Sequence, residues 1–555
     1  MPLLIERTLE VGQKLEGFEV KAITDLKQQH MVAYQLEHLK TGAKLLHLYS
    51  EDTENLFSIS FPTPPPNSTG VTHILEHSVL AGSEKYPVRE PFFEMLKMSP
   101  ATFINAMTGP DCTYYPVSSK VKQDLFNLAE VYFDAVFHPL LTKNTFKREG
   151  HHLAPSDPKN PTGELKFTGV VYNEMNGAFS DPEQRLDSIA NQNLFPDNIY
   201  GLESGGNPKN IPELTYEDFR DFHTNYYHPS NAYFVLYGNI STPEYLNFLS
   251  QKLEAFDRQE PNININPQSR WSEPKFKEDS YPISAADETT EKTYIMIKWL
   301  VGNSTDSEEW VALDILSRIL LGNEAAPLKK AIVESQMGQD ILRSGSDSVG
   351  KETTFHVSIQ GSEPERGEAF NQLVINTLET LAEKEIEPSI VEAAFQQAIY
   401  QHQEIAQMYP LRMLFRVMQT WIYSNEPLTL LHISDRLAEC KQRYIENPRY
   451  FNNLIREKLL NNPHRLTLVL KPDKEWQSNY DQAVVEQVEQ VRSQLTPEEL
   501  ERIATEAEEL QLESGTPNAP EQVAKLPQLQ VNDLPEQPEH IPTDVEELDG
   551  GVTLL

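Results

Sequence analysis

The chain has 555 residues, of which 39% are hydrophobic and 23% charged, as expected for a globular protein of two to four domains. Its formal net charge of −36 argues against nucleic acid as a partner, because the phosphates would be repelled. No run approaches the roughly 18 apolar residues that a membrane helix needs, so we expect no membrane partner. The charge either attracts cationic ligands over long range or serves solubility alone.

The cysteine content limits the kinds of site that this chain can build. Cys112 and Cys440 are too few for a disulfide scaffold or a multi-cysteine zinc site, so any metal must be held by His, Asp or Glu. The N-terminus lacks a basic segment followed by an apolar one, and it carries acids early. We therefore expect a cytoplasmic location, with Cys112 as a small buried side chain rather than a redox group.

Residues 1–260 are predicted to form a first domain in which strands precede helices. Alternating and apolar runs predict strands at 31–39, 43–50, 56–63 and 231–240. Helical periodicity appears at 72–82, 121–137 and 243–256. The last of these helices opens on a hydroxyl cap followed by an early proline and an early acid.

Residues 261–285 are rich in Pro and Asn without a steady period, so we interpret them as a linker. Residues 286–490 then predict a second domain of similar design, with a strand at 292–302, a helix at 307–322 and a strand–helix pair at 463–495. Pro229 and Pro463 open matching segments, 463 − 229 = 234 positions apart, which indicates a duplication. The second copy has "LDILSRILLG" where the first has "ILEHSVLAG", so it lacks the histidine and the glutamate and is expected to bind no metal.

Residues 491–555 are predicted to form a helical hairpin and a proline-rich linker. A capping box at Thr496 opens a helix that we expect to fold back on the preceding one. The final "GGVTLL" resembles the start of a strand whose partner lies elsewhere or on another chain. The predicted fold class is α+β: two duplicated domains, each a mostly antiparallel sheet with helices packed on one face, followed by a helical hairpin linker.

The stretch "VTHILEHSVLAG" carries the first chemical signal. On a helix, residues four apart share a face, so His73 and His77 can grip one zinc ion. Glu76 lies at the edge of that face, where it can take a proton from a water at the metal. The surrounding apolar residues would leave these polar groups half-buried, and buried polar groups need partners, which a metal supplies.

A catalytic zinc needs a third protein ligand and an open position for water. Glu174 is an isolated acid in the apolar helical run "LKFTGVVYNEM", where it is either a ligand or a surface residue. His151 and His152 are rival candidates, although their position beside a proline-rich loop suggests that they are exposed.

Several segments in order resemble the presequence protease branch of the pitrilysin and insulin-degrading enzyme family of inverzincin zinc metallopeptidases. They are "HILEHSVLAGSEKYPVREPFFEMLK", "TFINAMTGPDCTYYPVSS", "LFNLAEVYFDAVFHPLL" and "LKFTGVVYNEMNG". The resemblance is dense in the first domain and looser in the second. It implies a protease that cuts unstructured peptides inside a closed chamber.

Carried over position by position, the resemblance implies one zinc ion held by His73, His77 and Glu174, with Glu76 as catalytic base. Glu174 follows the second histidine by 174 − 77 = 97 residues, and the match favours it over the two rival histidines. Asn105 and Ala106 match the family's substrate-binding edge strand, which agrees with the ability of an exposed edge to pair with an extended peptide.

The sequence therefore predicts a zinc-dependent endopeptidase, or its N-terminal catalytic half, that degrades unstructured and preferentially basic peptides such as targeting peptides. Members of this branch are about twice as long, so the chain is either a fragment or one half of a split enzyme completed by a separate C-terminal half chain. The alternative is a non-catalytic peptide-binding or scaffold subunit of the same fold.

Overall fold

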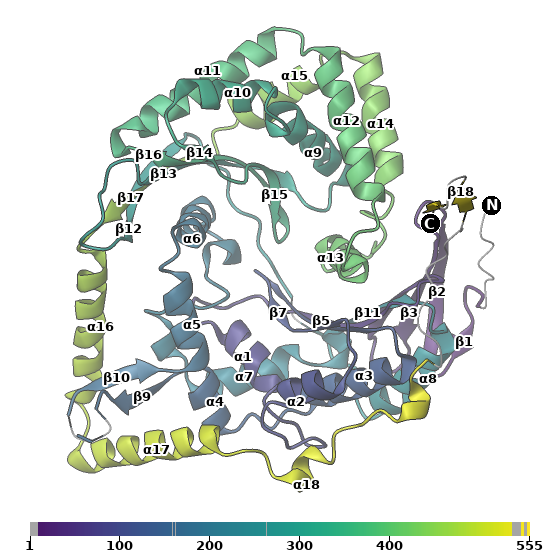
Figure 1. Ribbon diagram of the computed structural model, residues 1–555, viewed down its shortest axis with the longest axis vertical. Coiled ribbons are helices and arrows are strands. Elements are labelled where there is room, and N and C mark those ends of the chain that lie inside the picture. Colours follow the sequence, from purple (N-terminus) through teal and green to yellow (C-terminus); the bar gives the residue numbers. More distant parts are fainter. Residues whose placement is uncertain are drawn as a thin grey trace.

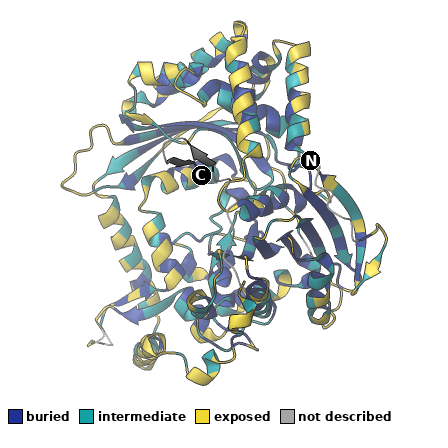
Figure 2. Ribbon diagram, turned by 45° about the vertical axis from the view of Figure 1, so that its right-hand side comes forward, coloured by how far each residue is buried: buried dark blue, intermediate teal, exposed yellow. Residues whose placement is uncertain are grey.

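The computed structural model describes residues 9–157, 159–160, 163–261 and 263–535, and the backbone of two short strands at 546–548 and 552–554. Two mixed sheets, each with its own helical layer, face one another across the molecule (Figure 1). Buried residues run along both sheets (Figure 2). The α+β class with mostly antiparallel sheets is confirmed.

The first sheet is built from residues 14–119 and one later strand. Its strands, in spatial order, are β1 (Lys14–Leu15), β2 (Phe18–Leu26), β3 (Met31–His38), β4 (Lys44–Tyr49), β11 (Tyr233–Gly238), β5 (Asn55–Pro62), β8 (Cys112–Ser119) and β6 (Phe103–Ile104). A further short strand, β7 (Met107–Thr108), also pairs with β8. Because β6 and β7 have β8 on one side alone among the described strands, they form an edge of this sheet.

Helices pack on one face of the first sheet and bury its main core. They are α1 (Val71–Val79), α3 (Lys122–Phe137), α4 (Lys143–Glu149), α5 (Val170–Ala178), α7 (Tyr216–Tyr226) and α8 (Thr242–Leu253). The short α2 (Pro91–Met98) and the hairpin of β9 (His152–Pro155) and β10 (Leu165–Thr168) complete this half. The strands and helices predicted from periodicity in residues 31–256 are present.

The second sheet repeats the pairing pattern of the first. Its strands, in order, are β12 (Lys275–Pro282), β17 (Arg465–Asp473), β13 (Thr293–Asn303), β16 (Glu352–Ser362) and β14 (Asp340–Ile341), with β15 (Gly345–Val349) also on β16. Strand β17 is parallel to β12 and antiparallel to β13, as β11 is parallel to β4 and antiparallel to β5. This correspondence supports the duplication inferred from the sequence.

Most helices of the second half pack on one face of this sheet. They are α9 (Ser307–Leu321), α10 (Pro327–Ser335), α11 (Gly367–Glu383), α12 (Pro388–Gln403), α14 (Ile433–Glu446) and α15 (Tyr450–Ile455). The linker predicted at 261–285 is wrong in its second part, because β12 lies within it. Four consecutive residues of this strand, Lys275 to Glu278, are exposed, so the strand has no apolar period, and its partner β17 lies nearly 200 residues further along the chain.

Each half also lends one helix to the opposite sheet. Helix α13 (Tyr409–Trp421), from the second half, packs its apolar face on the first sheet against Leu46, Leu48 and Val235. Helix α6 (Pro182–Leu194), from the first half, packs on the second sheet in the same way. Each sheet is therefore covered on both faces, and the two halves are joined through these exchanged helices.

The C-terminal part differs from the predicted hairpin. Helix α16 (Trp476–Arg492) begins inside the range assigned to the second domain, and α17 (Pro497–Gly515) packs along β9 rather than folding back on α16 (Figure 1). Asn144 of α4 also donates a hydrogen bond of 3.0 Å to Glu513 of α17. The terminal strand β19 (Val552–Leu554) pairs with β18 (Glu546–Leu548) of the same chain, a neighbour that the sequence did not predict.

Candidate active site

The helix that carries the histidine motif begins at a constrained glycine. Gly70 lies in the left-handed region at φ 71°, and a Cβ there would come within 2.7 Å of the Cα atom of Gly206. This close approach brings the carbonyl of Gly205 to the start of α1. The Nδ1 atom of His73 lies 3.0 Å from that carbonyl oxygen and donates to it in the matching tautomer, which leaves Nε2 free.

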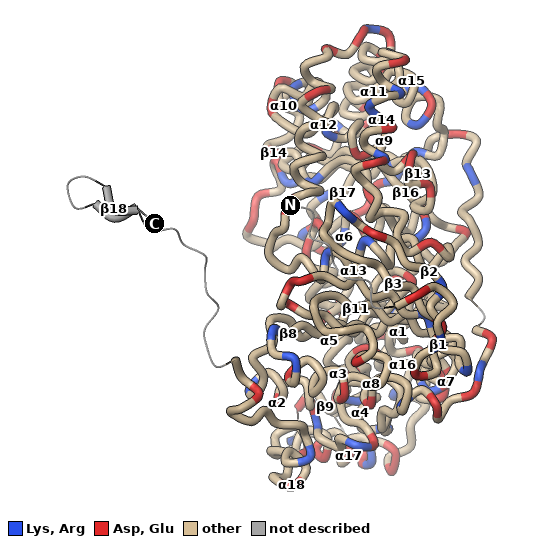
Figure 3. Tube along the Cα trace, turned by 90° about the vertical axis from the view of Figure 1, so that its right-hand side faces the viewer, with Lys and Arg blue, Asp and Glu red and all other residues tan. Residues whose placement is uncertain are grey.

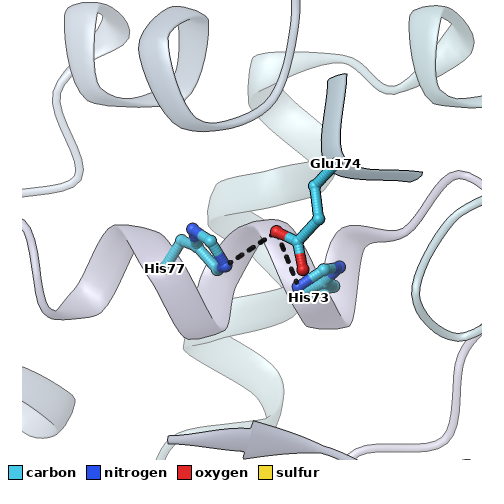
Figure 4. Close-up of side chains that lie close together, drawn as sticks. All are labelled: His73, His77 and Glu174. Atoms are coloured by element: carbon cyan, nitrogen blue, oxygen red, sulfur yellow. Dashed lines mark ion pairs between the residues drawn. The ribbon is translucent and has the colours of Figure 1, made fainter. Parts of the chain in front are cut away.

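The structure brings His73, His77 and Glu174 together (Figure 4). Their ligand atoms lie within 4.8 Å of one another. The Nε2 atoms of His73 and His77 are 3.9 and 3.7 Å from Oε2 of Glu174, which reaches them from α5. The two imidazoles are mostly buried, with 12% and 26% of their side chains exposed, whereas Glu174 is 53% exposed.

The donor set suits zinc. In a tetrahedral site, with bonds of about 2.0–2.1 Å, ligand atoms lie roughly 3.3 Å apart, so the distances of 3.7 and 3.9 Å from Glu174 to the two histidines need to shorten on zinc binding. Two imidazole nitrogens and one carboxylate are an established catalytic combination that leaves a fourth position open. The assignment of these three residues as ligands stays a prediction, and the geometry fits it.

Glu149 is a partner of the site that the sequence analysis missed. Its buried carboxylate lies 3.5 Å from Nδ1 of His77 and accepts a hydrogen bond of 2.9 Å from Arg148. Burial works to raise the pKa of Glu149, but His77 and Arg148 together hold it below the ordinary value. Burial likewise works to lower the pKa of His77, and the surrounding carboxylates hold it above the ordinary value.

The predicted base, Glu76, is buried on α1 beside the sheet edge. Thr108, on the edge strand β7, donates a hydrogen bond of 2.6 Å to Oε2 of Glu76. Asn105 and Ala106 lie between β6 and β7, with Asn105 exposed and Ala106 buried. The base and the predicted peptide-binding edge are therefore neighbours, and Thr108 joins them. Nothing in the spacing of the sequence pointed to Thr108.

The rival histidines lie outside this cluster and are not exposed, contrary to expectation. His151 Nε2 is 3.0 Å from the carbonyl oxygen of Leu214, and His152 Nδ1 is 2.7 Å from that of Lys147. Burial lowers the pKa of both histidines, and their hydrogen bonds to backbone carbonyls oppose that change only in part. Cys112 is buried as predicted.

Three family models match successive parts of the chain. The model described as "Insulinase (Peptidase family M16)" matches residues 63–155, which include the histidine motif. "Peptidase M16 inactive domain" matches residues 213–398, and a model for the region associated with subfamily C of the same peptidase family matches residues 470–555. Among the described residues, no helix is long and apolar enough to cross a membrane.

Curated relatives resemble the chain over nearly its whole length. Protein HypA of Clostridium perfringens is 37% identical over 97% of this chain and 55% of its own length. Presequence protease 1, chloroplastic/mitochondrial, of Arabidopsis thaliana is 36% identical over 99% of this chain and 51% of its own. The mitochondrial presequence protease of Mus musculus is 37% identical over 90% and 49%. The chain thus spans about half the length of these relatives.

Solved structures share the fold. A protease from Helicobacter pylori aligns with a TM-score of 0.61 at 16% identity, over 79% of this chain and 99% of its own. Pitrilysin aligns with a TM-score of 0.54 at 18% identity, over 83% of this chain and 47% of its own. Fold and sequence together make the chain similar to peptidases of family M16. Within that family, its similarity is to the presequence proteases.

Proposed function

We propose that the chain is the zinc-binding catalytic half of an endopeptidase that degrades unstructured peptides. The observation that carries this proposal is the convergence of His73, His77 and Glu174 on one point, beside a buried Glu76 and an open sheet edge. The family contributes the reaction class, because its members are peptidases.

The residues divide the work between binding the metal and moving protons. His73, His77 and Glu174 would hold the zinc, which when bound supplies a Lewis acid and lowers the pKa of a water in its open position. Glu76 accepts a proton from the attacking water and later donates it to the leaving amine. Thr108 donates a hydrogen bond to the Glu76 carboxylate and would hold it in one orientation for these proton transfers.

The edge strands would bind the substrate backbone. An extended peptide can add to β6 and β7 as a further strand, with its alternate side chains in pockets. The net charge of −36 favours basic peptides by long-range attraction, and acidic residues lie over both halves (Figure 3). Two relatives are named for presequences, so targeting peptides are the proposed substrate class.

The experiment compares the wild type with Glu76→Gln, at equal zinc content, on an unstructured basic fluorogenic peptide. We expect Glu76→Gln to bind zinc normally and to lose at least about 100-fold in turnover, because the general base is gone. Glu84→Gln is the matched control, since Glu84 is an exposed acid just beyond the same helix. Equal turnover in Glu76→Gln and wild type would overturn the mechanism.

The alternative of a scaffold subunit has a separate test. The chain spans about half the length of its relatives, so the assay is repeated with the remaining half of a relative added in trans. Turnover that appears with the added half supports a split catalytic unit. Tight zinc binding without turnover under both conditions supports the scaffold alternative.

A further inference from the structure

A buried carboxylate lies at the turn of the edge hairpin, away from the zinc ligands. Asp111 follows Gly109 and Pro110 in the turn that joins β7 to β8, and it is 2% exposed. The turn is closed by a hydrogen bond of 2.8 Å from the amide of Gly109 to the carbonyl of Cys112. A second backbone bond, of 2.8 Å from Thr63, fixes the carbonyl of Asp111 to the end of β5.

Two tyrosines from distant parts of the chain donate to one oxygen of this carboxylate. The hydroxyl of Tyr200 lies 2.7 Å from Oδ2 of Asp111, and that of Tyr423 lies 2.6 Å from the same atom. Tyr200 belongs to the short helix η1 (Ile199–Gly201), whereas Tyr423 follows the exchanged helix α13. Burial raises the pKa of Asp111, and the two hydroxyls oppose that rise.

The second half also contacts this cluster through its β15–β16 turn. The amide of Lys351 donates a hydrogen bond of 2.7 Å to the hydroxyl of Tyr200. Gly350, at φ 57°, lies so close to the ring of Tyr200 that a Cβ there would come within 2.2 Å of it. Two separate segments of the second half, at Tyr423 and at Lys351, therefore converge on the hairpin turn.

The hairpin leads directly to the proposed base. Thr108, which immediately precedes the turn, donates to Glu76, and the three residues before Thr108 include Asn105 and Ala106 of the proposed substrate edge. Burying a carboxylate costs free energy unless several donors bond to it. Packing of the two halves alone therefore does not explain why Asp111 is buried between them. A carboxylate with convergent donors fixes geometry more closely than an apolar contact does.

We propose that Asp111 is a positioning residue through which Tyr200 and Tyr423 hold the edge hairpin, and hence Thr108, against Glu76. The second half binds no metal in this proposal, and its contribution is to set the register of the substrate edge. The consequence for catalysis rests on the proposed peptidase function. The consequence for the hairpin itself does not.

The test measures hydrogen exchange of the amides at 105–109 in Tyr423→Phe, which removes one hydroxyl and keeps the ring. We expect exchange there to become about 5-fold faster, because one buried hydrogen bond is lost at the turn. Tyr237→Phe is the matched control: the hydroxyl of Tyr237 donates 2.9 Å to Asp52, and its ring contacts Tyr409 of α13, away from the hairpin. Tyr200→Phe serves as the second variant should Tyr423→Phe fail to fold.

Unchanged exchange at 105–109, or an equal rise in Tyr237→Phe, would overturn the proposal whatever the activity of the chain.

In the active enzyme we further expect Tyr423→Phe to lower kcat/KM about 3- to 10-fold without changing zinc affinity. The loss of kcat/KM caused by Tyr423→Phe should be smaller in a Thr108→Val background, because both substitutions act by weakening the contact between the hairpin and Glu76. Full additivity would show that the tyrosine acts on stability alone and would overturn the link to Glu76. Hydrolysis absent from every variant, with the local exchange effect present, would contradict the proposed function and leave the hairpin contact established.

Discussion

Glu149 does for His77 what the carbonyl of Gly205 does for His73. Each engages the Nδ1 side of its imidazole and leaves Nε2 facing Glu174. Such outer partners fix the tautomer and orientation of a metal-binding histidine. The two anchors differ in kind, because one is a backbone carbonyl and the other is a buried carboxylate.

Because Glu149 acts through its side chain, its role can be tested by substitution. We expect Glu149→Gln to weaken zinc binding about 10- to 100-fold, because the amide holds the imidazole of His77 less firmly. The measurement is competition for zinc with a chromophoric chelator. Glu352→Gln is the control, since Glu352 is also buried and accepts a hydrogen bond of 3.1 Å from the amide of Gln268 in the other half. Equal zinc affinity in both variants would contradict the positioning role.

The sequence predicts residues of the site only where helical spacing encodes the geometry. His73, Glu76 and His77 share one helix, so their meeting follows from its period. Glu174 needed the family resemblance, because its approach depends on how α5 packs beside α1. Glu149 and Thr108 carried no signal, since each reaches the site through tertiary contacts alone.

At the scale of elements, the start of α1 is a constrained point next to the site. Gly70 holds a left-handed conformation against Gly206, so a side chain there meets both backbone strain and a steric clash. We expect Gly70→Ala to cost about 1–3 kcal/mol of stability and to weaken zinc binding, because the carbonyl of Gly205 is pushed from His73.

The measurement combines a urea titration with the zinc competition assay. Gly177→Ala is the matched control, because Gly177 lies on α5 near Glu174 and a Cβ there meets nothing within 4 Å. That change should leave stability equal or raise it by about 0.5–1 kcal/mol. The prediction is wrong if both alanines behave alike.

Strand β12 shows which elements the sequence conceals. A strand whose exposed face is charged and whose partner is parallel and distant has neither the alternation nor the nearby turn that reveals a hairpin. The strands around β3, β4 and β5 have nearly continuous buried residues, and they were predicted. These strands could be predicted because both of their faces are buried, one by the helices of the first half and the other by α13 of the second half.

For the whole molecule, buried histidines predict sensitivity to acid. Burial lowers the pKa of His47 to about 3 and that of His223 and His464 to about 4, against about 6.5 in an unfolded chain. Below pH 6.5 these histidines therefore bind protons in the unfolded state but not in the folded state, so the free energy of unfolding decreases as the pH falls toward 4. The loss reaches about 1.4 kcal/mol per pH unit for each such histidine.

Urea midpoints measured from pH 7.5 to 5 check this expectation. His47 lies in the first core, with Nδ1 2.8 Å from Thr242 and rings of Tyr49 and Tyr245 against it. His47→Gln should flatten the pH dependence by about one proton. A stability that stays constant over this range would contradict the prediction.

The organisation of two similar halves was visible in the sequence, but the way in which they join was not. Periodicity reports that α6 and α13 each have an apolar face, and it cannot report which sheet that face covers. Both helices cross to the opposite half. A division of the chain into 1–260 and 286–490 therefore separates each sheet from part of its own covering.

The exchange of α13 has a consequence for the order of synthesis. A ribosome completes the first sheet at Gly238, yet the helix that shields its second face ends only at Trp421, 421 − 238 = 183 residues later. At about 5–20 residues per second, the apolar face with Leu46, Leu48 and Val235 stays bare for roughly 10–40 seconds. Throughout that interval the nascent chain offers a chaperone a surface that the finished protein no longer has.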